Sequence, residues 1–428
     1  SANDLIQLTF VGRTGSATDE VRIASNGGAA NNTTLAAALA CTYPETDDFT
    51  SDLIKSLNKD HGSRIAYNLS VDESPTHVKA WVSTGIRQLD YLTANRNSGG
   101  LPCGRIVEIF GPPSIGKSHI ALQIARSTQA MGGIVVYIDT ENGTSVENLG
   151  LLGVDVSKRF VFIETACTEE VFKVAESTIM KARGLNKDVP ITIVWDSVAA
   201  SSPKAELTGD YDKDTIGLQA RSISRGMRKI TQVIGNTNTL FICLNQTRTK
   251  IGVMYGDPTT TPGGMAIPFH SSIRIKLGAG SPIKNKDGDV VGINVSAKTI
   301  KNKVAPPFRS CQFEIHFGVG VKEHEQITDL LRSSADVIVG ENTYSVEGAG
   351  AWKTLTVSDT KTGEVKVEKK FTKSGMEDVL KNPEYSKHIE VMLEEILVKR
   401  FKANQDVDTD SYEEVRSIAM DLAESDLK

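Results

Sequence analysis

The segment from Gly111 to Ser118 constrains most strongly what this chain can fold into. It reads Gly-Pro-Pro-Ser-Ile-Gly-Lys-Ser and matches the pattern G-x-x-x-x-G-K-[ST]. An apolar run, Arg105–Phe110, comes directly before it, and a helical pattern, His119–Arg126, follows it. A glycine-rich loop between a strand and a helix is the setting in which this pattern binds the phosphates of a nucleoside triphosphate. The sequence therefore predicts a strand, a phosphate-binding loop and a helix in succession.

The residue types of this loop match the chemistry of a triphosphate. Glycines let backbone N–H groups turn toward phosphate oxygens, and the N-terminus of the following helix favours negative charge. Lys117 can reach the β- and γ-phosphates, and the Ser118 hydroxyl can bind Mg²⁺. We therefore expect ATP and Mg²⁺ as cofactors. The predicted nucleotide-binding residues of the loop are Gly111, Pro112, Pro113, Ser114, Ile115, Gly116, Lys117 and Ser118.

Apolar runs alternate with helical patterns from about Val82 to Val321, which predicts an α/β fold. Near-continuous apolar strands between helices indicate a mainly parallel sheet covered on both faces. Later runs alternate without helices between them and predict an antiparallel extension of that sheet. The parallel runs are Ile106–Phe110, Ile134–Ile138, Phe160–Ile163, Ile191–Trp195 and Leu240–Leu244, and the later runs are Ser272–Leu277, Gly292–Thr299 and Gln312–Phe317.

Polar residues follow three of the predicted parallel strands. Asp139-Thr140-Glu141, Asp196-Ser197 and Asn245-Gln246 each stand where a strand ends. Ligands bind outside the carboxyl ends of such strands, so we expect these clusters to converge on the phosphate loop. Asp196 is placed to hold Mg²⁺ from the second shell, in the Walker B role. Glu141 is placed to orient or deprotonate the attacking water, and Gln246 to sense the γ-phosphate.

With these residues in place, the chain resembles the RecA family of homologous recombination proteins, bacterial or phage. The resemblance runs from about Ser51 to about Phe401 and is densest between Gly85 and Gly320. The segments that carry it are Gly99–Pro102, Gly104–Ile109, Asp196–Ala200, Pro203–Glu206, Asn245–Met254, Thr261–Gly264 and Lys301–Phe308.

The resemblance implies roles for individual residues. Glu141 stands where the family has its catalytic glutamate, Lys117 belongs to the same catalytic set, and Gln246 stands where the family relays ATP binding to DNA. Lys301 and Lys303 stand where family members have lysines that reach the ATP of a neighbouring subunit. A cation supplied in trans would couple nucleotide binding to filament geometry.

The resemblance also implies two DNA-binding loops, Thr208–Ile216 and Thr247–Pro262, with a basic helix after the first. Arg and Lys neutralise phosphates, and Met254 and Tyr255 can wedge between or stack on bases. Few of these side chains can read base edges, so we expect sequence-independent binding. The predicted DNA-binding residues are Ser224, Arg225, Arg228, Arg248, Lys250, Met254, Tyr255, Gly263, Gly264 and Met265.

Three residues depart from the family pattern. Pro268 stands where the family usually has another trans-acting lysine, Asn148 where a tyrosine usually lies against adenine, and Met265 where an asparagine lies near the DNA. ATP affinity, turnover and coupling between subunits are the properties that these departures affect. They suggest a divergent member of the family.

The boundaries between segments follow composition and pattern, and the roles given to the packing helix and the core are those that the resemblance implies. We expect an N-terminal extension over 1–46, a helix and linker for subunit packing over 47–81 and an ATPase and DNA-binding core over 82–322. A small α+β domain over 323–403 and an acidic tail over 404–428 follow. In the extension only Leu8–Val11 has a strand pattern, and a short amphipathic helix is expected at Asp52–Lys59. Helical runs are expected at Gln326–Ser333 and Met376–Phe401, on either side of strand signals at Trp352–Glu368.

Charge and composition limit the class of protein. The net charge of −5 is concentrated after Gln405, where eight acids against two cations give −6 and leave +1 for the rest of the chain. Such a tail either competes with DNA phosphates or only aids solubility. No apolar run approaches the ~20 residues that span a bilayer. The five cysteines are scattered and form no Cys-x-x-Cys, which indicates a cytoplasmic protein without a disulfide framework or zinc ribbon.

The predicted function is an ATP-dependent recombinase with DNA-dependent ATPase activity. The resemblance implies helical filaments on single-stranded DNA, self-association and pairing with homologous double-stranded DNA. Two alternatives stay open. One is a ring helicase or other motor on the same core, and the other is a non-catalytic DNA-coating protein for which ATP is only a structural switch. Glu141 argues against the second.

Overall fold

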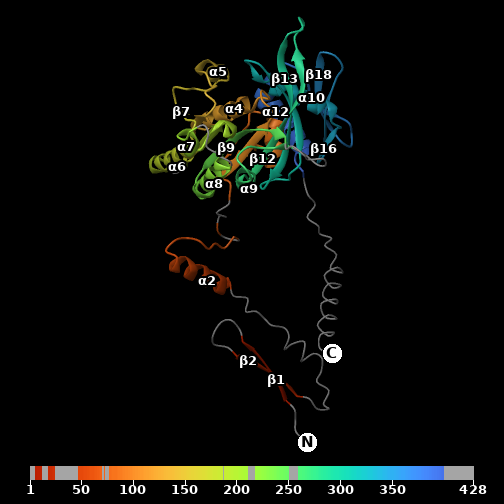
Figure 1. The fold of residues 1–428 in the computed structure, drawn as a ribbon. Helices are drawn as coiled ribbons and strands as arrows, with labels where there is room; N and C mark the ends of the chain where they lie inside the picture. Colours follow the sequence, from red (N-terminus) through yellow and green to blue (C-terminus); the bar gives the residue numbers. More distant parts are fainter. Residues whose placement is uncertain are drawn as a thin grey trace. The chain divides into compact units, whose positions relative to one another are not determined.

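The computed structural model describes residues 5–11, 18–24, 47–69, 72, 77–186, 188–210, 217–249 and 259–399. The chain divides into two compact units, Ser1–His77 and Val78–Lys428. The second unit contains the phosphate loop and all the strands of the predicted parallel sheet (Figure 1).

The first unit contains a hairpin and a helix. Strands β1 (Leu5–Val11) and β2 (Thr18–Ala24) pair antiparallel, so the single strand expected at Leu8–Val11 is half of a hairpin. Helix α2 (Asp47–Asp60) is longer than the expected Asp52–Lys59. Its Phe49, Leu53 and Leu57 are 58%, 48% and 38% exposed. Side chains four residues apart share a helix face, so α2 carries an uncovered apolar stripe.

Within the described residues the central sheet has nine strands, in the order β15-β14-β13-β12-β5-β9-β8-β6-β7. All neighbouring pairs from β12 to β7 are parallel. The predicted fold class, a mainly parallel sheet with an antiparallel extension, is confirmed. The parallel strands after β12 are β5 (Arg105–Gly111), β9 (Thr239–Gln246), β8 (Ile191–Asp196), β6 (Ile134–Asp139) and β7 (Phe160–Glu164).

The antiparallel extension begins one strand later than expected. Strand β12 (Ile273–Lys284) pairs parallel with β5, whereas the alternation at Ser272–Leu277 had placed it in the extension. Strands β13 (Val290–Asn302), β14 (Ser310–His316) and β15 (Gly320–Val321) then follow antiparallel. Alternation reflects one half-exposed face of a strand and does not give the direction of its neighbour.

Helices cover both faces of the central sheet, and alternate strand residues feed two apolar clusters. On one face Val107, Ile109 and Tyr137 pack with α4 (Lys117–Ala130). On the other face Ile106, Val136 and Trp195 pack with α6 (Thr168–Leu185), α8 (Leu218–Gly235) and α9 (Ala266–His270). Because a strand buried on both sides needs apolar residues at every position, the runs read from the sequence were continuous.

A third apolar cluster lies between a four-stranded antiparallel sheet of the described residues and three helices. The expected helix Met376–Phe401 is two helices, because Asn382 caps the second through its side chain and Pro383 begins it. The elements are β16 (Val337–Val339), β17 (Asn342–Glu347), β18 (Trp352–Asp359), β19 (Val365–Thr372), α10 (Glu323–Ser333), α11 (Met376–Lys381) and α12 (Pro383–Leu397).

Short elements complete the described chain. They are β3 (Trp81–Val82), α3 (Arg87–Ala94), β4 (Leu101–Pro102), α5 (Val146–Leu151), the 3₁₀ turn Val198–Ala200, α7 (Lys204–Leu207), β10 (Arg248–Thr249) and β11 (Thr259–Thr260).

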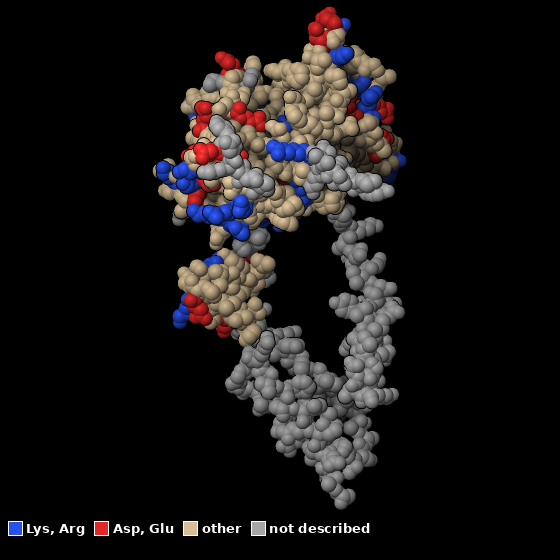
Figure 2. All heavy atoms as spheres, in the orientation of Figure 1, with Lys and Arg blue, Asp and Glu red and all other residues tan. Residues whose placement is uncertain are grey.

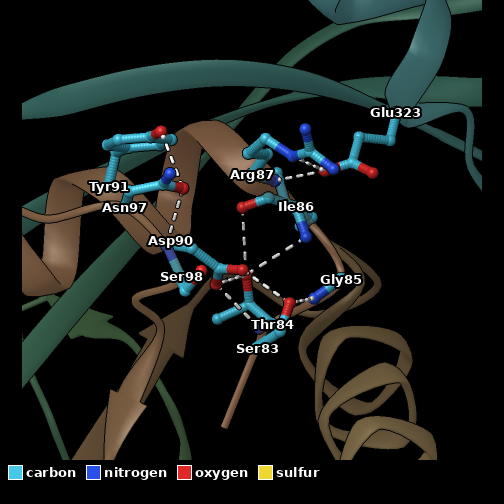
Figure 3. Close-up of polar contacts among 10 residues, drawn as sticks. All are labelled: Ser83, Thr84, Gly85, Ile86, Arg87, Asp90, Tyr91, Asn97, Ser98 and Glu323. Carbon is cyan, nitrogen blue, oxygen red and sulfur yellow. Dashed lines mark hydrogen bonds and ion pairs between the residues drawn. The ribbon is translucent and has the colours of Figure 1, made fainter. Parts of the chain in front are cut away.

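A buried carboxyl group organises the start of α3 (Figure 3). Asp90 accepts hydrogen bonds from the Thr84 backbone N–H at 2.7 Å, the Thr84 hydroxyl at 2.6 Å and the Ser83 hydroxyl at 2.5 Å. Beside it, Arg87 of α3 pairs with Glu323 of α10 and so joins the central core to the C-terminal helices. Burial raises the pKa of Asp90 to about 7, although the three hydrogen bonds favour its ionised form.

This raised pKa predicts a pH dependence of stability. An unfolded aspartate has a pKa of about 3.9, so between about pH 4 and 7 the folded protein holds a proton that the unfolded chain has released. The free energy of unfolding therefore falls as pH rises from the unfolded pKa to the folded pKa of Asp90. We expect the stability advantage of the wild type over Asp90→Asn, measured by urea denaturation, to shrink by about 2–3 kcal/mol between pH 5 and 8. An advantage that grows over this range would show that the hydrogen bonds outweigh burial.

Candidate nucleotide-binding site and nucleic-acid interface

The phosphate loop connects β5 to α4 as the sequence predicts. Gly116, the residue before α4, has a φ of 91°, a conformation that residues with a Cβ rarely adopt. A Cβ there would also lie 2.4 Å from Cδ1 of Ile315. The backbone conformation thus requires glycine, and a larger residue would also displace the Ile315 methyl group. No side chain caps this helix end. The first N–H groups of α4 are left to face an anion.

Lys117 lies folded over this loop. Its side chain is 9% exposed, and its Nζ donates to the carbonyl oxygens of Pro112 at 2.7 Å and Gly111 at 3.3 Å. Burial lowers the pKa of Lys117, while the carboxylates of Asp196 and Glu141 raise it. The ammonium group is therefore bonded to the loop backbone and lies within the electrostatic influence of both acids.

Asp196 and Ser118 form the candidate metal side of the site. Asp196 ends β8 and is 7% exposed. Ser118 and Tyr137 both hydrogen-bond its carboxylate, the latter with a 2.5 Å O–O distance. Burial raises the pKa of Asp196, and these hydrogen bonds lower it. A carboxylate beside a hydroxyl is the oxygen donor set that Mg²⁺ prefers, so these residues fit the ion.

Glu141 and Gln246 meet at the same edge of the sheet. Gln246 Nε2 donates to Oε1 of Glu141 at 3.0 Å, and the Ser197 hydroxyl donates to the same oxygen. The strand register brings these residues to one edge, because Asp139 lies opposite Asp196 and Gln246 lies opposite Gly111. The three polar clusters therefore converge as predicted.

Two side chains of this edge were given no role from the sequence. The Ser197 hydroxyl contacts Glu141, and Tyr137 holds Asp196 from inside the sheet. Tyr137 stands two residues before Asp139 in an apolar run, where the pattern predicts a core side chain. Only its hydroxyl could have indicated a role in the site, because a buried tyrosine hydroxyl usually has a hydrogen-bond partner.

Helix α8 presents the basic face expected for nucleic acid. Its buried side includes Ile223, Met227 and Ile230, while Arg225 and Arg228 are exposed and Ser224 is half-buried. Figure 2 shows Lys and Arg side chains gathered over α6 and α8. A groove between these helices is lined by Lys173, Arg221 and Lys229, which were not predicted as site residues, and also by Glu169 and Glu176. Glu176 pairs with Lys229 at 2.6 Å, so this groove is of mixed charge.

The second predicted DNA segment is described at its two ends. Arg248 is exposed in β10, and β10 pairs with β11 so that the segment returns beside its start. Gly263 has a φ of 89°, and a Cβ there would lie 2.8 Å from Cδ1 of Ile223 in α8. The glycine thus lets this segment pack directly on the basic helix. Gly264 and Met265 are exposed, whereas Lys250, Met254 and Tyr255, with residues 211–216 of the first loop, lie outside the described residues.

The end of β9 is bonded to the end of this segment. Asn245 Nδ2 donates to Oε1 of buried Glu108 at 3.0 Å and to the carbonyl oxygen of Pro262 at 3.1 Å. The Gln246 N–H donates to Oδ1 of Asn245 at 3.0 Å. The residue that contacts Glu141 is therefore two hydrogen bonds from the segment that packs on α8.

Lys301 and Lys303 lie apart from the phosphate loop of their own chain. Lys301 is opposite Arg274 of β12 in β13, two strands from β5. Its Nζ donates to the carbonyl oxygens of Pro268 at 2.6 Å and Phe269 at 2.9 Å. Burial lowers the pKa of His270, and the charges of Lys301, Arg228 and Lys303 lower it further. His270, which hydrogen-bonds Thr231 of α8, is therefore within the electrostatic influence of both lysines and of Arg228.

The departures from the family pattern have partial structural accounts. Pro268 is half-buried in α9, where its carbonyl holds Lys301. Asn148 is in α5, and its side chain lies outside the described part of the chain. No helix of the described residues has the length and apolar character to cross a bilayer.

The fold and this edge define a P-loop nucleoside triphosphatase core. The model of the RecA N-terminal domain family matches residues 50–322. The protein RecA of Bacteroides thetaiotaomicron is 38% identical over 71% of this chain and 84% of its own length. Protein RecA of Thermus aquaticus is 39% identical over 70% and 82% of the two chains, and that of Bdellovibrio bacteriovorus 36% over 70% and 74%. The chain belongs to the RecA family of ATP-dependent recombinases.

Lys117→Ala tests the nucleotide site. Removing the ammonium group deletes the charged donor nearest to the expected phosphates, so nucleotide affinity should fall by about a hundredfold or more. Titration of a fluorescent ATP analogue with Mg²⁺ measures the change. Lys158→Ala, at an exposed lysine, is the matched control and should bind as the wild type does. Wild-type affinity of Lys117→Ala would remove Lys117 from the site.

Proposed function

We propose that this chain forms helical filaments on single-stranded DNA with ATP and Mg²⁺ and exchanges strands with homologous duplex DNA. The observation that carries the proposal is the contact between Gln246 and Glu141, together with the bond from Asn245 to Pro262. It supports direct communication between the hydrolytic edge and a DNA-binding segment, which a DNA-dependent ATPase needs.

In the nucleotide site each residue has a proposed task. Residues Gly111 to Ser118 bind the phosphates through backbone N–H groups and the Lys117 ammonium group. Ser118 and Asp196 hold Mg²⁺, which supplies charge neutralisation at the phosphates. Glu141 orients the attacking water and accepts its proton. Gln246 exchanges its bond with Glu141 for one to the γ-phosphate when nucleotide is bound.

For DNA we propose binding through the sugar–phosphate backbone. Arg225, Arg228 and Arg248 are exposed, and Lys250 extends this set, so phosphate neutralisation would dominate affinity and make it salt-dependent. Exposed Gly264 lets the chain approach the phosphates closely, and the Ser224 hydroxyl can donate to them. Gly263, predicted as a DNA contact, is buried, so it supports the segment on α8 and does not touch DNA itself. Met254, Tyr255 and Met265 supply base contacts that any sequence can make. Specificity for homology then comes from base pairing between the strands.

Self-association is proposed to use two surfaces. The apolar stripe of α2, with Phe49, Leu53 and Leu57, packs on the next subunit and removes that area from water. Lys301 and Lys303 reach the nucleotide of the neighbour, which makes ATP part of the interface. This arrangement corresponds to the proposed division into 47–81 for packing, 82–322 for catalysis and DNA, and 323–403 as an appended domain.

Electron microscopy with single-stranded DNA tests the function. We expect helical filaments with a non-hydrolysable ATP analogue and Mg²⁺, shorter or fewer filaments with ADP, and ATP hydrolysis that rises when single-stranded DNA is added. Hexameric rings that unwind duplexes without exchanging strands would favour a motor. DNA coating without ATP turnover would favour the structural-switch alternative, and a monomer indifferent to DNA would contradict the proposal.

A further inference from the structure

A buried tyrosine connects the two halves of the nucleotide site. The Tyr137 hydroxyl donates to Oδ2 of Asp196 at 2.5 Å and accepts from the Thr144 hydroxyl. The Ser118 hydroxyl donates to the same Asp196 carboxylate. A continuous chain of hydrogen bonds therefore runs from Thr144 through Tyr137 and Asp196 to the first turn of α4.

Thr144 closes the loop that carries Glu141. Asp139 accepts from the Glu141 N–H at 2.9 Å and from the Thr144 N–H at 3.0 Å, one on each carboxylate oxygen. These bonds fold residues 140–144 into a compact turn. The chain through Tyr137 thus ties this turn to the carboxylate on the metal side.

The Tyr137 ring is held from the side. It is fully buried and stacks with Phe160 and Phe162 of β7 at centroid distances of 6.4 and 6.3 Å. A fixed ring keeps the hydroxyl oxygen within hydrogen-bond distance of Asp196. Packing that fixes a side chain next to a metal ligand is how a protein sets the direction of that ligand.

We propose that Tyr137 is a positioning residue for the metal side of the nucleotide site: it fixes one oxygen of Asp196 beside Ser118 and, through Thr144, couples the turn carrying Glu141 to that carboxylate. The inference rests on the proposed nucleotide site and adds a residue to it. Without the hydroxyl, Asp196 is a buried carboxylate that has lost a donor, and its direction is set by Ser118 alone.

Tyr137→Phe tests the inference, because it removes one oxygen atom and keeps the stacked ring. The readout is the Mg²⁺ concentration that half-saturates the Mg²⁺-dependent part of fluorescent ADP binding. We expect about a tenfold increase, the scale of one hydrogen bond to a charged group. Binding of the nucleotide without Mg²⁺ and the melting temperature should stay close to those of the wild type.

Tyr91→Phe is the matched control, since it deletes another largely buried tyrosine hydroxyl, which donates to Asn97 at 3.1 Å. Its Mg²⁺ dependence should equal that of the wild type. Thr144→Val is a second variant; it keeps the backbone bond to Asp139 and should lower the hydrolysis rate several-fold with a smaller change in the half-saturating Mg²⁺.

Three results separate the possible failures. An unchanged half-saturating Mg²⁺ concentration in Tyr137→Phe would overturn the inference. Equal weakening of nucleotide binding with and without Mg²⁺ would also overturn it, since that is the result of a merely structural role. Failure of the wild type itself to bind nucleotide would contradict the proposed function and not this inference alone.

Discussion

The contact between the Gln246 amide and the Glu141 carboxylate is the interaction on which the rest of the site depends. It joins the ends of two parallel strands, and the residues at each strand end make further hydrogen bonds. Glu141 is also held by Ser197, next to Asp196, while Gln246 is bonded to Asn245. A group that attracts Gln246 away from Glu141 would therefore change both the contacts of the proposed catalytic glutamate and the path to Pro262.

This arrangement places the proposed DNA-binding segments next to the nucleotide edge. Gly263 packs on Ile223 of α8, so the end of one segment and the basic helix form one surface. Asn245 bonds Pro262, the residue before that glycine. Short hydrogen bonds and close packing transmit small displacements because packed interiors have discrete arrangements. Only a few such contacts separate the nucleotide edge from the proposed DNA surface.

Much of this could be predicted from the sequence, and the limits have physical causes. The parallel strands were readable because β5, β6, β8 and β9 are buried on both faces, and the phosphate loop because its glycines and lysine have fixed tasks. The direction of β12 was not readable, since a strand pattern does not contain the identity of its neighbour. Tyr137 was missed because its ring is core and only its hydroxyl contacts the candidate site. The hairpin partner β2 was missed because Thr18–Ala24 contains three charged residues and lacks a continuous apolar run.

Central to the account is that nucleotide alters DNA affinity through Gln246. The most direct measurement is the affinity for single-stranded DNA with a non-hydrolysable ATP analogue and with ADP, in the wild type and in Gln246→Ala, at several salt concentrations. In the wild type the analogue should tighten DNA binding by about tenfold or more, a coupling in the usual range. Gln246→Ala should bind both nucleotides normally but lose most of that difference. A variant that retains the full nucleotide effect on DNA binding would contradict the account.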